Sequence, residues 1–229
     1  MNGTNRAETR FPSPSSPEAK DLPMFLKTTT GLAASLMLMA APLTAMAQDQ
    51  AAPVEARTEE QQQSRTPSAE QVLSSLETVS PLDLVYVVVK YWKRGDRQQA
   101  AFWYYIWQIR TDAWADLDSG FGLYRSMLDN DVSITINNWI GSDPEMWRDT
   151  VERAIAYEPK LPMWRLRPEG MTLEEWSAHV DAKRAEYARE TADMMARMSP
   201  EQMIAARREA GLPVGPLVDA GTPLPDEWR

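Results

Sequence analysis

Gln108 and Arg110 are two polar side chains in the most apolar stretch of the chain, residues 97–116. A guanidinium binds carboxylates and other anions through paired hydrogen bonds, and a carboxamide both donates and accepts. If these groups are buried, both must find partners inside the protein. Asn137 and Asp143 follow further along the chain, and Asp143 offers the charge that Arg110 needs. The first interpretation is therefore a structural polar cluster in which Arg110 pairs with Asp143.

The same residues also fit a ligand site. In this second interpretation the polar groups form the floor of a pocket, and a small polar or anionic ligand binds between two tryptophans that flank it. The residues of this candidate site are Trp103, Gln108, Arg110, Asn137 and Trp139.

Paired carboxylates can carry acid–base catalysis, which suggests an alternative function. Asp112 and Asp116 are four residues apart, so they share one face of a helix. With Glu152 and Glu158 they define the alternative, a hydrolase that acts on envelope material. Acids at this spacing are more often a solvated helix end. The sequence also lacks a nucleophile–base set, and we assign no catalytic residue.

Metal and cofactor chemistry has few residues to use. The chain has no Cys and a single His, His179, which excludes thiolate zinc sites, thiol nucleophiles and sites built from several histidines. No acidic loop of the calcium-binding type is present. We therefore expect no metal and no cofactor. The formal net charge of −9 repels phosphate backbones, so we also expect no nucleic-acid partner.

Residues 24–47 have the three-part layout of a secretory signal peptide. Lys27 precedes an apolar run, and the segment closes on a small-x-small triplet that ends at Ala47. The run is shorter than the about 20 residues that cross a bilayer, which favours cleavage near Ala47 over a retained anchor. We expect a periplasmic or secreted protein with no stable membrane anchor after cleavage.

Composition divides the chain into four segments. Residues 1–23 are polar and rich in Pro and Ser, and they form a leader that is either misassigned or disordered. The signal peptide occupies residues 24–47. Residues 48–66 have almost no large apolar side chain, which predicts a disordered linker. Residues 67–229 are predicted to form a single helical domain.

Caps and apolar spacing predict the helices that position these residues. Ser68 opens a capping box, Pro81 begins a helix that ends at Gly95, and Asp96 caps the buried helix over residues 97–116. Further helices are predicted to begin after three N-cap residues, Asp143, Thr172 and Ser199.

The remaining segments are less regular. Residues 129–141 fit a strand or a helix, and we favour a helix or irregular chain because no second strand signal pairs with them. The tail from Leu212 contains four prolines and forms either an extended strap or a frayed end, with Trp228 as the residue that docks it. The fold class is therefore all-α, with about six helices.

Two resemblances to known proteins add to the predicted fold. A tetratricopeptide-like hairpin is indicated by the spacing of Tyr91, Gly95, Ala100 and Tyr104. No 34-residue period is present, so the chain resembles one such hairpin and not an array. Residues 102–110, with the pattern FWxYxxQxR, and residues 136–143, with INxWxxxD, resemble an uncharacterised family of exported bacterial proteins. This resemblance implies export and a helical fold, and no particular activity.

The predicted function follows from the export signal, the helical hairpin and the missing nucleophile–base set. We expect an exported helical binding or interaction protein without intrinsic catalysis, whose partner is a protein of the cell envelope. An inhibitor or immunity-type protein that blocks an exported enzyme is one form of this function. The sequence indicates no particular ligand or oligomeric state.

Overall fold

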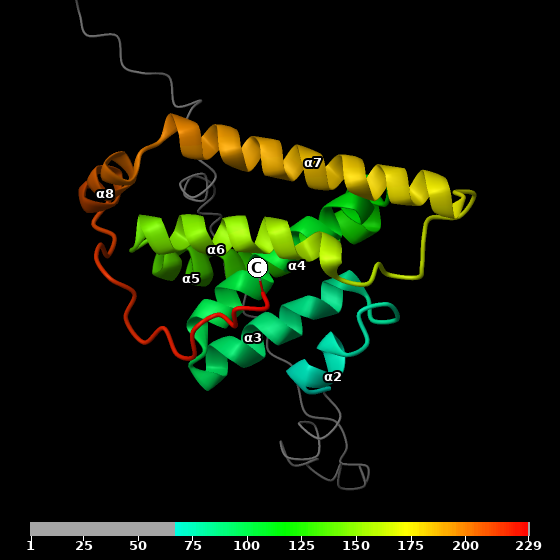
Figure 1. Ribbon diagram of the computed structural model, residues 1–229, viewed down its shortest axis with the longest axis horizontal. Coiled ribbons are helices and arrows are strands. Elements are labelled where there is room, and N and C mark those ends of the chain that lie inside the picture. The colour runs from blue at the N-terminus through cyan, green and yellow to red at the C-terminus, as the bar shows by residue number, and fades with distance from the viewer. Residues whose placement is uncertain (1–66, 229) are drawn as a thin grey trace, which may run out of the picture. The chain divides into compact units, whose positions relative to one another are not determined.

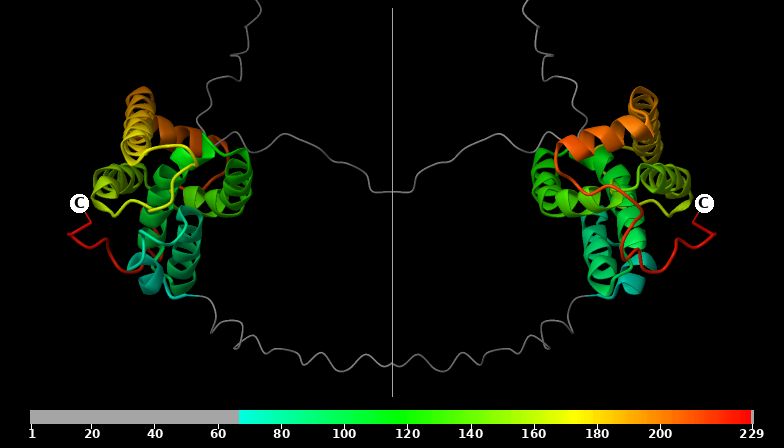
Figure 2. Two further views of the ribbon diagram at one scale, coloured as in Figure 1. Left: turned by 90° about the vertical axis from the view of Figure 1, so that its right-hand side faces the viewer. Right: turned by 90° about the vertical axis from the view of Figure 1, so that its left-hand side faces the viewer.

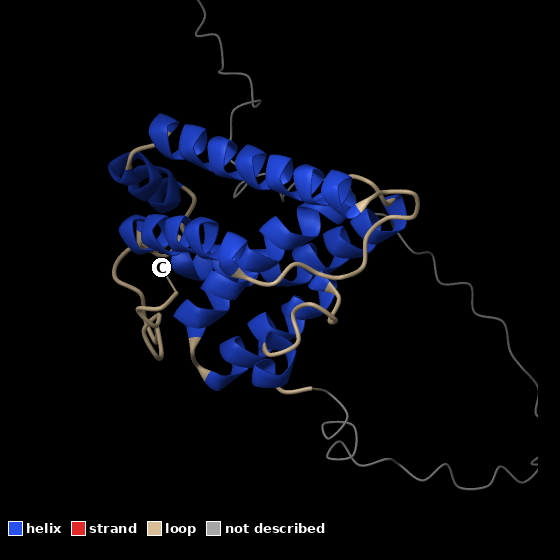
Figure 3. Cartoon of the chain, turned by 45° about the vertical axis from the view of Figure 1, so that its right-hand side comes forward, coloured by secondary structure: helices blue, strands red, loops and turns tan. Residues whose placement is uncertain are grey.

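The computed structural model describes residues 67–228, and the predicted leader, signal peptide and linker lie outside the described residues. Over this part of the chain every regular element is a helix and no strand occurs, which confirms the all-α prediction (Figure 3). None of the described helices is both long and apolar enough to span a membrane.

Seven α-helices and two short 3-10 helices make up the described fold, against the about six helices expected (Figure 1). The difference lies in α5, which covers the segment left open between strand and helix. In chain order the elements are α2 (Ala69–Leu73), η2 (Pro81–Asp83), α3 (Leu84–Arg94), α4 (Arg97–Ala115), α5 (Ser119–Ile140), α6 (Pro144–Tyr157), η3 (Glu158–Lys160), α7 (Leu173–Arg197) and α8 (Pro200–Glu209).

Short-range signals explain where most of these helices begin and end. The hydroxyls of Ser68, Thr172 and Ser199 accept from the third amide of their helices, and a Gln or Glu side chain returns a bond, which completes three capping boxes. Asp143 caps α6, because its Oδ1 accepts from an amide of the first turn at 3.1 Å. Gly95 ends α3 at φ +91°, a conformation that favours glycine.

The central helix is α4, as predicted for residues 97–116. Its side chains Phe102, Tyr104, Ile106 and Trp107 are all fully buried. Helices α3, α5, α6 and α7 pack against it. The turned views place α7 and α8 on one side of α4, and α2 and α3 on the other (Figure 2). A helix that is apolar nearly all round requires this kind of enclosure.

Helix α5 is one continuous helix of 22 residues that includes Gly120 and Gly122. A Cβ built on Gly122 would lie 3.1 Å from the carbonyl oxygen of Ala115, so the glycine permits a close approach to the end of α4. Ile136 and Ile140 are the buried residues of α5. They face the core at helical spacing, and this packing overrides the alternating pattern that suggested a strand.

The strap, residues 212–228, leaves α8 and lies along the turn between α3 and α4 (Figure 1). The amide and hydroxyl of Thr222 donate to Oδ1 of Asp96 at 3.0 and 2.6 Å. Asp96 is the N-cap residue of α4, as predicted, but its side chain makes no hydrogen bond to the helix. Trp228 stacks on Phe102 of α4 with ring centroids 4.9 Å apart. The strap is therefore docked and not frayed, and Trp228 is its anchor.

Candidate functional site

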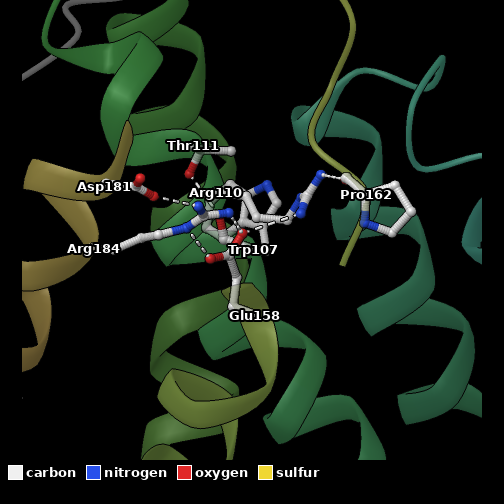
Figure 4. A network of polar contacts seen from close by, with 7 residues as sticks. All are labelled: Trp107, Arg110, Thr111, Glu158, Pro162, Asp181 and Arg184. Carbon is white, nitrogen blue, oxygen red and sulfur yellow. Dashed lines mark hydrogen bonds and ion pairs between the residues drawn. The ribbon is translucent and has the colours of Figure 1, made fainter. Parts of the chain in front are cut away.

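A buried ion-pair cluster joins α4, η3 and α7 (Figure 4). Arg110 of α4 donates from Nη1 to Oε1 of Glu158 at 3.1 Å, and Arg184 of α7 donates to both carboxylate oxygens at 2.6 and 3.1 Å. The side chains of Arg110 and Glu158 are only 4% and 2% exposed. A further bond runs from Nη2 of Arg110 to the carbonyl oxygen of Pro162 at 2.6 Å. The cluster thus links segments that are far apart in the sequence.

Arg110 is buried and paired, as the structural interpretation requires, but its partner is Glu158 and not Asp143. Asp143 is used as the N-cap of α6, as its position before Pro144 also allowed. Glu158 begins η3 directly after α6 ends, and its side chain points between α4 and α7 there (Figure 4). Burial lowers the pKa of the Arg110 guanidinium, and the charge of Glu158 opposes this. A guanidinium stays protonated at neutral pH regardless.

A second polar cluster surrounds Gln108 between α4, α5 and α7. Its Nε2 donates to the hydroxyl oxygen of Tyr104 at 2.5 Å and to Oδ1 of Asp129 at 3.4 Å. Its Oε1 accepts from the hydroxyl of Tyr187 at 3.2 Å. The hydroxyl of Tyr104 donates in turn to Asp129 at 2.8 Å. Both ends of the Gln108 amide therefore have partners within the protein, as a half-buried amide requires.

The other residues of the predicted ligand site lie elsewhere. Asn137 accepts from the hydroxyl of Tyr105 at 3.0 Å. Trp103 is buried edge to face against Trp228 of the strap, with ring centroids 5.4 Å apart. The indole of Trp139 donates to a strap carbonyl at 2.8 Å. The structure therefore divides the five predicted residues among separate clusters and does not gather them around one opening.

The carboxylates of the hydrolase alternative lie on α4, α6 and η3. Glu158 lies between two arginines, and Glu152 is exposed on α6. Asp112 and Asp116 share Lys183 of α7, with N–O distances of 3.9 and 3.3 Å. Three of the four acids are therefore paired with cations. Within residues 67–228, no group of three or more His, Asp or Glu side chains is placed to hold a metal ion.

A shallow depression between the α4–α5 turn and the loop before α7 contains none of the predicted site residues. Asp118 in its wall caps α5 by accepting from the Phe121 amide at 3.0 Å. Arg167 in its wall donates to the carbonyl oxygen of Met171 at 2.8 Å. These two polar groups already have structural roles. The residues that line the depression are Trp114, Leu117, Asp118, Ser119, Arg167, Pro168 and Glu169.

The outer face of α5 carries an apolar stripe that the sequence patterns did not reveal. Leu123, Met127 and Ile134 follow at intervals of four and seven residues, which places them along one line of the helix. They are 67%, 58% and 50% exposed, and Tyr124 beside them is 49% exposed. We call these four residues the α5 stripe. A helical wheel over residues 119–140 would have found them, had the segment been predicted as one helix.

Comparison of the chain with models of known families, with curated proteins and with solved structures finds no match. The resemblance to a family of exported bacterial proteins stays a prediction. The structure itself defines a class: an all-α domain whose distant helices are joined by buried polar clusters, and whose C-terminal strap is docked onto a helical hairpin.

Alkaline pH tests the polar cluster around Gln108. Burial raises the pKa values of Tyr104, Tyr105 and Tyr187. The negative charge of Asp129 raises the pKa of Tyr104 further. These phenols therefore add stability below the unfolded-state pKa of about 10, and this stability is lost as pH rises further. We expect these three of the seven tyrosines to ionise only as the chain unfolds.

Tyrosinate absorbance and far-ultraviolet circular dichroism, recorded on one sample, measure both events. Tyr104→Phe should lower the unfolding free energy by about 1–3 kcal/mol at neutral pH, because the hydrogen bonds to Asp129 and from Gln108 are both lost. Ionisation of all the tyrosines while the helical signal persists would contradict the prediction.

Proposed function

We propose that this protein is an exported, periplasmic helical interaction protein without intrinsic catalysis, and that the α5 stripe is where a protein partner docks. The exposure of the stripe carries the proposal, because its four large apolar side chains lie together on the outer face of one helix. Single apolar residues are normal at a protein surface, whereas contiguous ones are typical of contact sites. Export rests on the predicted signal peptide.

The charges around the stripe indicate the chemistry of the partner. Asp131 is exposed on α5 and Asp118 is exposed just before the helix begins, while the exposed Asp116 is paired with Lys183 of α7. Arg125, the cation of α5, is turned inward, where its Nε donates to the hydroxyl of Thr111 at 2.7 Å. The stripe is therefore bordered by carboxylates on a chain of net charge −9. A surface with an apolar patch and basic residues around it fits, because complementary charges steer association.

An inhibitor or immunity-type role is one form of this proposal. A small acidic helical protein that covers a basic substrate cleft would exclude the substrate by occupancy alone. Such a role needs a rigid apolar face with acidic edges and needs no reacting group on the protein itself. The α5 stripe supplies that face on a helix that α4 holds from behind.

Recovery of the tagged chain from the periplasm tests the proposal. The wild-type chain should bring down a partner protein, and the yield should fall as salt rises, because exposed charges are screened. A Leu123→Ser, Met127→Ser chain should lose the partner. The matched control is Leu166→Ser with Leu173→Ser, since these side chains are each 60% exposed outside the stripe. Each substitution should change the unfolding free energy by no more than about 0.5 kcal/mol.

Two results would count against the proposal. Recovery of the same partner by the stripe variant would show that the partner docks elsewhere. A wild-type chain that brings down no partner and instead turns over envelope material would favour the hydrolase.

A further inference from the structure

The surface beneath the end of the strap is built like a peptide-binding groove. Residues 223–228 lie across α4 and α6, and the Trp228 amide donates to the carbonyl oxygen of Pro225 at 3.1 Å, which closes a turn (Figure 1). Trp228 stacks on Phe102 with ring centroids 4.9 Å apart, and it lies edge to face with Trp103 at 5.4 Å. Tyr157 of α6 completes the pocket, with its ring centroid 6.4 Å from that of Trp228. An aromatic pocket made by two helices thus receives one aromatic side chain.

Donors on α4 and α6 bind the main chain of the same segment. Arg153 donates from Nη2 to the carbonyl oxygen of Pro225 at 2.9 Å and from Nε to that of Trp228 at 3.4 Å. Gln99 donates from Nε2 to the carbonyl oxygen of Pro223 at 3.3 Å. These contacts use carbonyl oxygens, which proline keeps, and none uses the N–H that proline lacks. These main-chain contacts leave the side chains of the segment open to change, apart from Trp228 in the pocket and the buried Leu224.

The earlier part of the strap is fitted to this chain alone. Thr222 donates twice to Asp96. Gly221, at φ +75°, packs so closely on the carbonyl oxygen of Gly95 that a Cβ has no room there. These contacts hold the strap near the groove even when its last residues leave. Residues 221 and 222 therefore attach the strap to the hairpin turn, whereas residues 223–228 occupy the groove.

We propose that the groove of α4 and α6 binds a proline-containing, turn-forming segment of a partner protein that carries an aromatic anchor, and that residues 223–228 are its built-in occupant. The partner segment replaces the end of the strap, places its ring on Phe102 and offers carbonyl oxygens to Arg153 and Gln99. Proline restricts such a segment before it binds, so little conformational freedom is lost on binding. The site uses no residue of the α5 stripe and does not depend on docking there.

A labelled peptide of residues 222–229 tests the groove, with fluorescence anisotropy as the measurement. It is titrated into the full wild-type chain and into the full Trp228→Ala chain. The tethered strap competes at an effective concentration of about millimolar, so the wild-type groove should be masked. We expect the peptide to bind the Trp228→Ala chain about tenfold more tightly or better. The same peptide with alanine in place of its tryptophan should not bind.

A second substitution identifies the groove as the binding site. Adding Arg153→Gln to the Trp228→Ala chain should weaken binding of the peptide, while adding Arg189→Gln, an exposed arginine of α7, should leave it unchanged. Equal binding to the wild-type and Trp228→Ala chains, or no binding to a folded Trp228→Ala chain, would overturn the proposal.

Hydrogen exchange of the wild-type chain gives a test that needs no variant. Peptide supplied above the effective concentration of the tethered strap, about millimolar, should speed amide exchange in the strap and leave α4 unchanged, because the strap is displaced while the helices stay folded. Unchanged exchange in the strap would overturn the proposal. So would a wild-type chain that dimerises with rising concentration while the Trp228→Ala chain does not, because the groove would then belong to the strap of a second copy.

Discussion

Glu158→Gln is expected to lower the free energy of unfolding by about 3–5 kcal/mol, the cost of breaking a buried ion pair by removing one charge. The substitution keeps the size of the side chain and removes its charge. Arg110, with a side chain only 4% exposed, would then be a buried guanidinium without a counter-ion. Arg184 would lose the same partner. Urea denaturation followed by circular dichroism measures the loss.

The matched control for this substitution is Glu152→Gln, the same change at an exposed position of α6. It should alter the unfolding free energy by no more than about 0.5 kcal/mol. The double substitution Arg110→Met with Glu158→Leu should cost less than the two single ones together, because the buried charge of Arg110 is removed with its partner and Arg184 keeps Asp181. A loss below about 1 kcal/mol for Glu158→Gln would mean that water reaches the cluster.

Arginine side chains give this cysteine-free chain its long-range connections. Arg148 of α6 donates from Nη2 to the carbonyl oxygens of Met195 and Met198, at 2.7 and 2.5 Å, where α7 ends. Arg207 of α8 donates to the carbonyl oxygen of Asn138 near the end of α5 at 2.7 Å. The last carbonyls of a helix have no partner within it, so a guanidinium from another element can both satisfy them and fix the packing.

The parts of the fold that depend on neighbouring residues could be predicted from the sequence. Ser68, Thr172 and Ser199 begin helices because each cap and its Gln or Glu are three residues apart, and Asp143 begins α6 for a similar local reason. The burial of α4 also followed from composition, since a helix with aromatic residues on every side has no face for water.

The partners of polar groups could not be predicted, because they depend on how distant elements pack. Arg110 pairs with a residue 48 positions away, and spacing alone does not distinguish Glu158 from Asp143. The partner of Asp96 was even harder to predict. Its position before α4 is that of an N-cap, but Thr222, 126 residues further on, takes its carboxylate instead. For this reason the residues predicted to form one site lie in separate clusters, although most of the helices that carry them were predicted correctly.

Gly221→Ala is expected to lower the unfolding free energy by about 2–4 kcal/mol and to release the strap locally. An alanine at φ +75° costs about 1–2 kcal/mol by itself. Its Cβ would also lie 2.6 Å from Cα of Asp96, against backbone that cannot move aside. The strap must therefore shift, and hydrogen bonds such as that from the Gln98 amide to Ala220 are lost at about 1 kcal/mol each. Urea denaturation measures the total.

Gly170→Ala separates the two causes. Gly170 has a similar φ of +84°, but nothing lies within 4 Å of a Cβ built on it. Its replacement should cost only the conformational strain, about 1–2 kcal/mol, and should leave the strap protected from hydrogen exchange. In the Gly221→Ala chain the strap amides should exchange faster than those of α4. Equal losses for the two alanines, with the strap protected in both, would show that the contact with Gly95 and Asp96 relaxes easily. The strap would then be held by Trp228 and the groove beneath it, and not by its tight passage over the hairpin turn.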